Sequence, residues 1–65
     1  MNRYKVIYFT GNSFYDEKAK EIVQEKATVD VTAYTHTLAI KAAGTKVGKS
    51  VTEMQAAMLD CIVQK

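Results

Sequence analysis

The chain is poor in the residues that usually stabilise a very small protein or hold a metal. Its 65 residues include one cysteine, Cys61, one histidine, His36, and neither proline nor tryptophan. One cysteine cannot form an intramolecular disulfide, and a zinc site needs three or four cysteine or histidine ligands. We therefore expect no metal site and no cofactor. Because a domain of this size buries only a small core, close packing or self-association must supply further stability.

Long apolar runs and a strong charge of one sign are also missing. No apolar segment approaches the ~18 residues of a membrane-spanning helix, and the opening residues MNRYKVIYFTGN are too polar for a secretory signal. The net charge of +2 falls short of the basic face of a dedicated nucleic-acid binder. We expect one domain, residues 1–65, that has no membrane contact and lies in the cytoplasm, where a lone reduced thiol is stable.

The first half of the chain predicts a strand, a helix and a second strand. Residues 3–10, RYKVIYFT, are apolar on both faces at their centre, which is typical of a parallel strand covered on both sides. Residues 13–26 predict a helix whose first turn carries Ser13 and Asp16 at capping-box spacing. Residues 28–35, TVDVTAYT, alternate as a half-exposed edge strand does. The expected fold is a small α/β or α+β protein with a right-handed βαβ core and parallel strands.

The second half predicts helices more than strands. Residues 36–43 are ambiguous, because their composition favours a short helix that ends at Gly44 while a strand is the alternative. Ser50 and Glu53 form a capping box, which predicts the start of a long C-terminal amphipathic helix.

The apolar residues of this C-terminal helix cover an arc of about 200°, roughly twice what packing on one sheet needs. The helix should therefore also contact a second copy of the chain or a protein partner. The residues expected in that interface are Met54, Met58, Leu59, Ile62 and Val63.

The string AGTKVGKS, residues 43–50, fits a loosened phosphate-loop pattern. A working phosphate loop needs a strand that leads into it and a carboxylate on another strand that positions magnesium, and the predicted elements supply neither. Its glycines and serine are better explained as a helix end and a helix start. A weaker role remains, in which a helix N-terminus and nearby lysines hold an anion without catalysis. The candidate anion-binding residues are Lys46, Gly48, Lys49 and Ser50.

A longer resemblance covers residues 5–31, KVIYFTGNSFYDEKAKEIVQEKATVDV. This segment resembles the first strand, active-site helix and second strand of glutaredoxins, whose motif is Cys-Pro-Tyr-Cys. Ser13, Tyr15 and Asp16 stand at positions of that motif, and Ser13 and Asp16 replace its two cysteines. The resemblance implies βαβ geometry without redox activity, since thiol–disulfide exchange requires a thiolate.

These observations favour a non-catalytic interaction module that self-associates and binds a protein partner. Two alternatives stay open. One is a redox-inactive glutaredoxin-like domain with a partner groove near Ser13 and Tyr15. The other is a phosphate- or nucleic-acid-binding module that uses GTKVGKS, because Gly48-Lys49-Ser50 is also similar to the start of the last helix in double-stranded RNA-binding domains.

Overall fold

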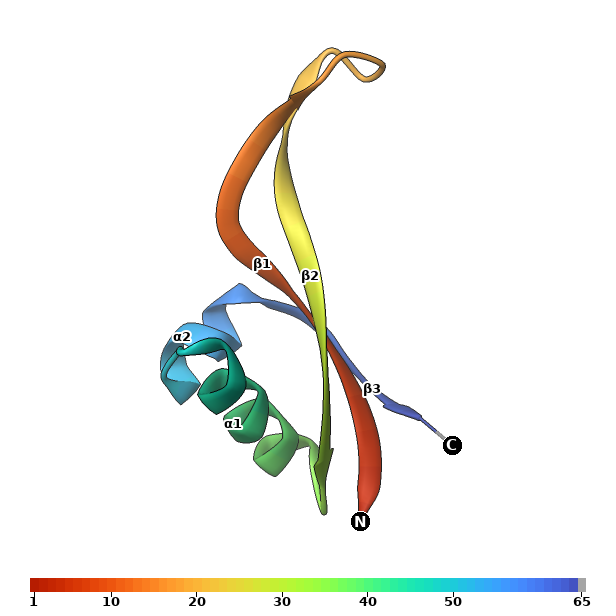
Figure 1. Cartoon of the computed structure of the whole chain (residues 1–65), viewed down its shortest axis with the longest axis vertical. Coiled ribbons are helices and arrows are strands. Elements are labelled where there is room, and N and C mark those ends of the chain that lie inside the picture. The colour runs from red at the N-terminus through yellow and green to blue at the C-terminus, as the bar shows by residue number, and fades with distance from the viewer. Residues whose placement is uncertain (65) are drawn as a thin grey trace.

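The protein folds into a three-stranded antiparallel sheet with two short helices on one face (Figure 1). The computed structural model describes residues 1–64. The elements in chain order are β1 (Asn2–Asp16), β2 (Glu21–Ala33), α1 (His36–Val47), α2 (Val51–Ala57) and β3 (Met58–Gln64). The order of strands in the sheet is β2-β1-β3, and both outer strands run antiparallel to the central β1.

The predicted βαβ core with parallel strands is wrong, because residues 13–26 form no helix. They make the end of β1, a turn and the start of β2, so that these two strands are one long antiparallel hairpin. Phe14 pairs with Val23, and Tyr15 pairs with Ile22. Aromatic and β-branched side chains favour strands and stabilise a sheet through such cross-strand pairs, which outweigh the helical spacing of the same residues. The βαβ geometry implied by the resemblance to glutaredoxins is wrong for the same reason.

Asp16 organises the turn of this hairpin. Its Oδ1 accepts hydrogen bonds from the backbone N–H groups of Lys18, at 2.9 Å, and Ala19, at 3.3 Å. Lys20 has a left-handed φ of 56°, and its N–H donates to the Asp16 carbonyl at 2.7 Å. Asp16 therefore does satisfy backbone donors, as a helix cap would, but those donors belong to a turn.

The helical interpretation of residues 36–43 is confirmed by α1. Thr35 is its N-cap, and the Thr35 Oγ1 accepts a hydrogen bond from the N–H of Leu38 at 3.2 Å. On the inner side of the helix Ala39 and Ala43 have no exposed surface. These small side chains allow the helix to lie close to the strands.

The predicted helix end at Gly44 is wrong, and the reason is packing. The helix continues to Gly48, which has a left-handed φ of 76°, and the N–H of Lys49 donates to the Gly44 carbonyl at 2.8 Å, as is typical of such helix ends. A Cβ atom on Gly44 would lie 2.8 Å from the Lys49 carbonyl oxygen and 3.5 Å from the Cβ of Met54. Gly44 is therefore needed inside α1 because it lets the start of α2 come close.

The capping box of α2 is confirmed, but the long C-terminal helix is wrong. The Ser50 Oγ accepts the N–H of Glu53 at 3.2 Å, and the Glu53 Oε1 accepts the N–H of Ser50 at 3.1 Å. The helix ends at Ala57, and residues 58–64 form β3 along the second edge of β1. Pairing at this edge gives hydrogen-bond partners to backbone groups of β1. The helix propensity of residues 58–64 is a weak preference that this pairing outweighs.

The core lies between the helices and one face of the sheet, which we call the inner face. Its buried members are Tyr4, Val6, Val31, Ala33, Ala39, Ala43 and Met54. The alternation predicted for residues 28–35 is correct, since Val31 and Ala33 point inward and are buried, whereas the cover predicted on both faces of the first strand is wrong, because both helices lie on one face (Figure 1). No helix of residues 1–64 covers the opposite, outer face (Figure 1), and none is long and apolar enough to cross a membrane.

The molecule is extended for its length. Its radius of gyration is 13.1 Å and its longest dimension 42 Å, whereas a compact domain of this length has a radius of gyration of about 11 Å. Its accessible surface of 4723 Å² exceeds by about 600 Å² the area of a compact protein of this mass. Figure 1 shows one cause, because the far half of the β1–β2 hairpin extends beyond the helices.

Candidate interaction surfaces

The candidate anion-binding residues lie together in the connection between α1 and α2, and each has a structural role. The Nζ of Lys46 donates to the backbone carbonyl of Asp30 on β2 at 2.7 Å. Gly48 and Lys49 form the end of α1, and Ser50 caps α2. These contacts account for the string GTKVGKS without a ligand, and α2, with seven residues, is too short to concentrate a helix dipole.

No cavity and no cluster of metal-ligating side chains is found within residues 1–64. Exposed large apolar side chains occur in groups of three on the far half of the hairpin and on β3, and the others are Met1, Tyr34, Leu38 and Val51.

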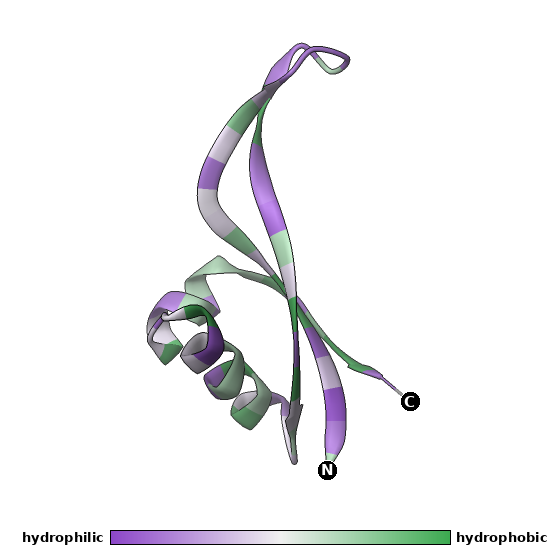
Figure 2. Cartoon of the chain, in the orientation of Figure 1, coloured by the Kyte–Doolittle hydropathy of each residue, from purple (hydrophilic) through white to green (hydrophobic). Residues whose placement is uncertain are grey.

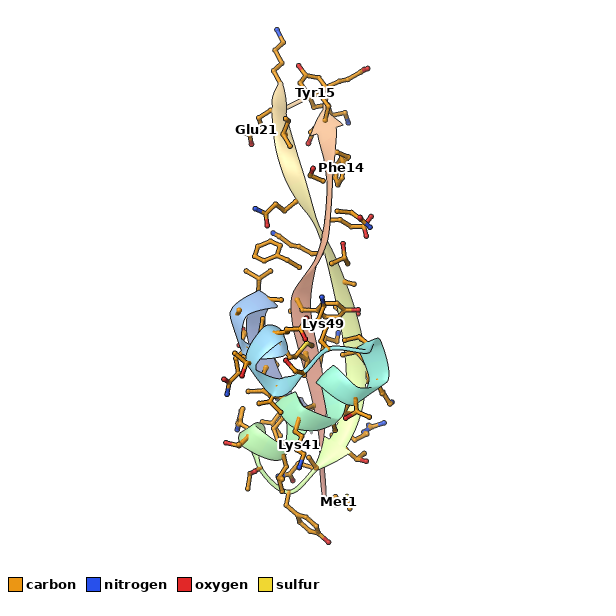
Figure 3. All side chains as sticks on the ribbon, turned by 90° about the vertical axis from the view of Figure 1, so that its left-hand side faces the viewer. Met1, Phe14, Tyr15, Glu21, Lys41 and Lys49 are labelled. Atoms are coloured by element: carbon orange, nitrogen blue, oxygen red, sulfur yellow. The ribbon has the colours of Figure 1, made fainter. Side chains whose placement is uncertain are left out.

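The first surface, which we call the hairpin arm, comprises residues 10–25. The pairing of β1 with β2 shifts register between Phe9 and Ser13, and the arm begins at that irregularity. Its large apolar side chains are well exposed, at 52% for Phe14, 60% for Tyr15 and 74% for Ile22. Figure 3 shows Phe14 and Tyr15 at the far end of the molecule, away from Lys41 and Lys49 on the helix side.

The arm also contains all three glutaredoxin-motif positions. Ser13 and Tyr15 are exposed on β1, and Asp16 is occupied by the turn. The arm carries four carboxylates and two lysines, which gives it a net charge of −2 in a chain of net charge +2. This segment is therefore both apolar and acidic.

The second surface is β3, where the residues predicted to form an interface have different positions. Met54 belongs to the core and Met58 is half-buried. Leu59, Ile62 and Val63 remain exposed, at 46%, 44% and 40%. Figure 2 shows a hydrophobic stretch of β3 next to the C-terminus, where the strand runs away from both helices.

One hydrogen bond shows how the backbone of β3 is oriented. The N–H of Cys61 donates to the Oδ1 of Asp60 at 2.8 Å, so it points away from β1. Successive residues of a strand direct their N–H and C=O groups to opposite sides, and the N–H of Val63 therefore also points outward, whereas that of Ile62 points to β1. We call this outward row of backbone groups the β3 edge. Within residues 1–64 no strand pairs with it.

The free edge of β2, on the other side of the sheet, is protected differently. The Asp30 carbonyl points outward there, and Lys46 reaches across from α1 to bond it. Of the 13 residues of β2, four are charged, whereas β3 has one charged residue among seven. Charged side chains on an edge strand oppose pairing with another chain, so β2 is the better protected edge.

Two ionisable groups near α2 and β3 have shifted pKa values. Partial burial, with a smaller contribution from the carboxylate of Asp60, raises the pKa of the Cys61 thiol. Hydrogen bonds from the backbone and side chain of Ser50, with a smaller contribution from Lys49, lower the pKa of Glu53. Cys61 is thus a neutral thiol at neutral pH, and Glu53 is a carboxylate held by its capping box.

Sequence reasoning missed the arm and the β3 edge, whereas it correctly placed the strand of residues 28–35 at an edge of the sheet. Residues 21–24, EIVQ, do not alternate between apolar and polar and so gave no sign of a strand, while the roles of Lys46 and Asp60 depend on backbone orientation. Comparison with known protein families, with curated proteins and with solved structures found no match.

Proposed function

We propose that the protein is a non-catalytic interaction module that self-associates and binds a protein partner. The observation that carries this proposal is the exposure of large apolar side chains at two separate places, β3 and the hairpin arm, around a core of seven buried residues. Exposed apolar patches on a small protein mark surfaces that associate with other molecules. The proposed location is the cytoplasm, where the single thiol stays reduced.

The two surfaces suit different partners. β3 offers an unpaired edge together with Leu59, Ile62 and Val63, which suits addition of another strand. The arm offers aromatic and aliphatic side chains but an acidic balance. A net negative charge repels phosphates, so the arm suits a protein surface with an apolar patch and a basic rim, and disfavours nucleic acid.

Light scattering during size-exclusion chromatography tests self-association. At micromolar concentration the expected mass is twice that of the chain or more. A monomer mass at every concentration up to the millimolar range would overturn the self-association.

A capture experiment tests the second half of the proposal. The immobilised wild-type protein is compared with an Ile22→Ser variant, which changes the most exposed apolar side chain of the arm, and with Thr28→Ser as a matched control outside it. We expect a protein that is retained by the wild type and by the control and lost with Ile22→Ser. Equal retention by all three would remove the arm as the binding surface.

A further inference from the structure

We propose that the occupant of the β3 edge is β3 of a second copy of the chain, paired antiparallel about a two-fold axis at Cys61. The two three-stranded sheets then form one continuous sheet of six strands. This inference rests on the self-association proposed above and specifies its surface and register. Four observations lead to it, taken in turn below.

The first observation is the orientation of the backbone. The N–H groups of Cys61 and Val63 point away from β1, as the bond from Cys61 to Asp60 requires. Only residues with outward N–H and C=O groups can bond to a second strand. In an antiparallel pair, Cys61 of one copy can therefore face either Cys61 or one of its outward neighbours.

The second observation is that β3 is self-complementary in only one of these registers. With Cys61 opposite Cys61, all seven residues of β3 overlap, Asp60 lies opposite Ile62, and Leu59 lies opposite Val63. Moving the axis to Asp60 would place two carboxylates directly opposite each other, which is unfavourable. Moving the axis to Ile62 would pair only five of the seven residues of β3 with one another.

The third observation concerns the side chains. Cys61 and Val63 share the inner face with Val6 and Tyr4, their partners on β1, whereas Ile62 lies on the outer face. The inner face of β3 is therefore apolar, and its outer face carries Ile62 between Asp60 and Gln64. Exposed apolar side chains with a single charged residue are unusual on an edge strand that stays unpaired. Pairing with a second copy makes β3 internal.

The fourth observation is the exposed apolar surface of β3. Leu59, Ile62 and Val63 are 46%, 44% and 40% exposed, and in the proposed register Leu59 of one copy lies beside Val63 of the other. The β2 edge cannot serve as well, because Lys46 already bonds the Asp30 carbonyl there.

Disulfide trapping tests the register, because the chain has one cysteine. Two residues that face each other in a hydrogen-bonded antiparallel pair have Cα atoms about 5.5 Å apart, within the range a disulfide spans. Diamide takes up the two electrons and two protons released when two thiols join. The reaction is run at pH 8.5 on folded protein at concentrations where light scattering reports a dimer, and is read on a non-reducing gel.

We expect at least a tenfold faster formation of the cross-linked dimer than for a Cys61→Ser/Thr32→Cys variant, whose thiol lies on the β2 edge. Circular dichroism confirms that both proteins are folded. A dimer by light scattering that does not cross-link faster than the variant would overturn the β3 register and leave the proposed self-association intact. A monomer by light scattering would overturn both.

Discussion

The two edges of the sheet differ in what their outward backbone groups meet. On β2 the Asp30 carbonyl is bonded by Lys46, a side chain from another element, and three more charged residues lie earlier in the strand, at positions 21, 25 and 26. On β3 the N–H of Cys61 meets only the carboxylate of its own neighbour, Asp60, among apolar side chains. An outward backbone group of β2 is thus bonded by a side chain from a distant element, whereas an outward backbone group of β3 is bonded only by its sequence neighbour.

The difference indicates which edge is free to bind. Edge strands are sites of unwanted pairing, and proteins protect them with lysines, charges and covering elements. β2 has this protection, whereas β3 has one local hydrogen bond that a second strand can replace. This difference is the reason why we propose association at β3 rather than at β2.

The largest effect is expected from a substitution that disturbs the packing of α1 on α2. In Gly44→Ala the new Cβ would lie 2.8 Å from the Lys49 carbonyl oxygen, which is backbone and cannot move cheaply. We expect a loss of about 2 to 3 kcal/mol in the free energy of unfolding, measured by urea denaturation. Thr45→Ala, at the next, exposed position of α1, should change it by no more than about 0.5 kcal/mol. Equal effects of the two substitutions would contradict the close packing of α1 on α2.

The next largest effect is expected from a substitution that disturbs pairing at the β3 edge and leaves the rest of the fold unchanged. In the proposed dimer Ile62→Glu places a carboxylate opposite Asp60 of the other copy, twice by symmetry. Like charges directly opposite each other cost up to about 1 kcal/mol per pair, so we expect the dissociation constant to rise about 10- to 30-fold, measured by sedimentation. Within one chain Ile62 lies opposite Lys5, so the same change should not weaken the fold.

Ile62→Lys and Thr32→Glu are the matched controls for this charge effect. The lysine would face Asp60 of the other copy as an opposite charge. Within its own chain it would lie opposite Lys5, so circular dichroism must first show that this variant is folded. Thr32→Glu alters the β2 edge instead. Both should dissociate less readily than Ile62→Glu. If Glu and Lys at position 62 raise the dissociation constant equally, the effect comes from lost apolar contact and not from charge. Position 62 would then not face Asp60, and the pairing would have another register.

A smaller effect is expected from removing the lysine that protects the β2 edge. Lys46→Met removes the hydrogen bond to the Asp30 carbonyl, and Lys41→Met is the control on the same helix. We expect Lys46→Met to lower the free energy of unfolding by about 0.5 to 1 kcal/mol. At high concentration it should also form species larger than a dimer in light scattering, because both edges can then pair. Identical behaviour of the two variants would show that Lys46 does not protect β2.

The smallest effect is the loss of stability of α2 at acid pH. This helix leads directly into β3. The folded pKa of Glu53 lies below its ordinary value of 4.5, chiefly because Ser50 donates hydrogen bonds to the carboxylate. Its stabilisation is therefore present above about pH 5 and is lost as the pH falls through the folded pKa. Between pH 6 and pH 3 the Tm of Glu53→Gln should fall less than that of the wild type. Glu17→Gln, in the turn of the arm, should behave as the wild type does.

The sequence predicted those features that depend on neighbouring residues. The inward face of β2 follows from alternation, so Val31 and Ala33 were expected to point inward, and both are buried. The caps at Thr35 and Ser50 follow from side chains that bond the backbone three residues away. Such local rules hold whatever the tertiary fold is.

The sequence did not predict features that depend on distant pairing. Residues 13–26 fit a helical period although their aromatic and β-branched residues favour strands, and no glycine, proline or asparagine marked the turn after Asp16. The wide apolar arc predicted for the C-terminal helix was a sign of the same ambiguity, because residues that are apolar on nearly all sides of a helix are also apolar on both faces of a strand. Pairing with β1 decided between the two.

The residues predicted to form an interface divide between the surface and the core. Leu59, Ile62 and Val63 were expected to lie at an interface and are exposed, although on a strand rather than a helix. Met54 was placed with them because helical spacing put it on the same arc, and it lies in the core instead. The protecting roles of Lys46 and Asp60 follow only from the direction of individual backbone groups, which no local pattern contains.

Amide hydrogen exchange at two neighbouring residues tests pairing of the β3 edge most directly. The N–H of Ile62 points to β1 and that of Val63 points outward. We predict that Ile62 is protected from exchange at every protein concentration, whereas protection of Val63 appears only as the concentration rises into the range where light scattering reports a dimer. Fast exchange of Val63 throughout that range, with Ile62 protected, would contradict pairing at the β3 edge.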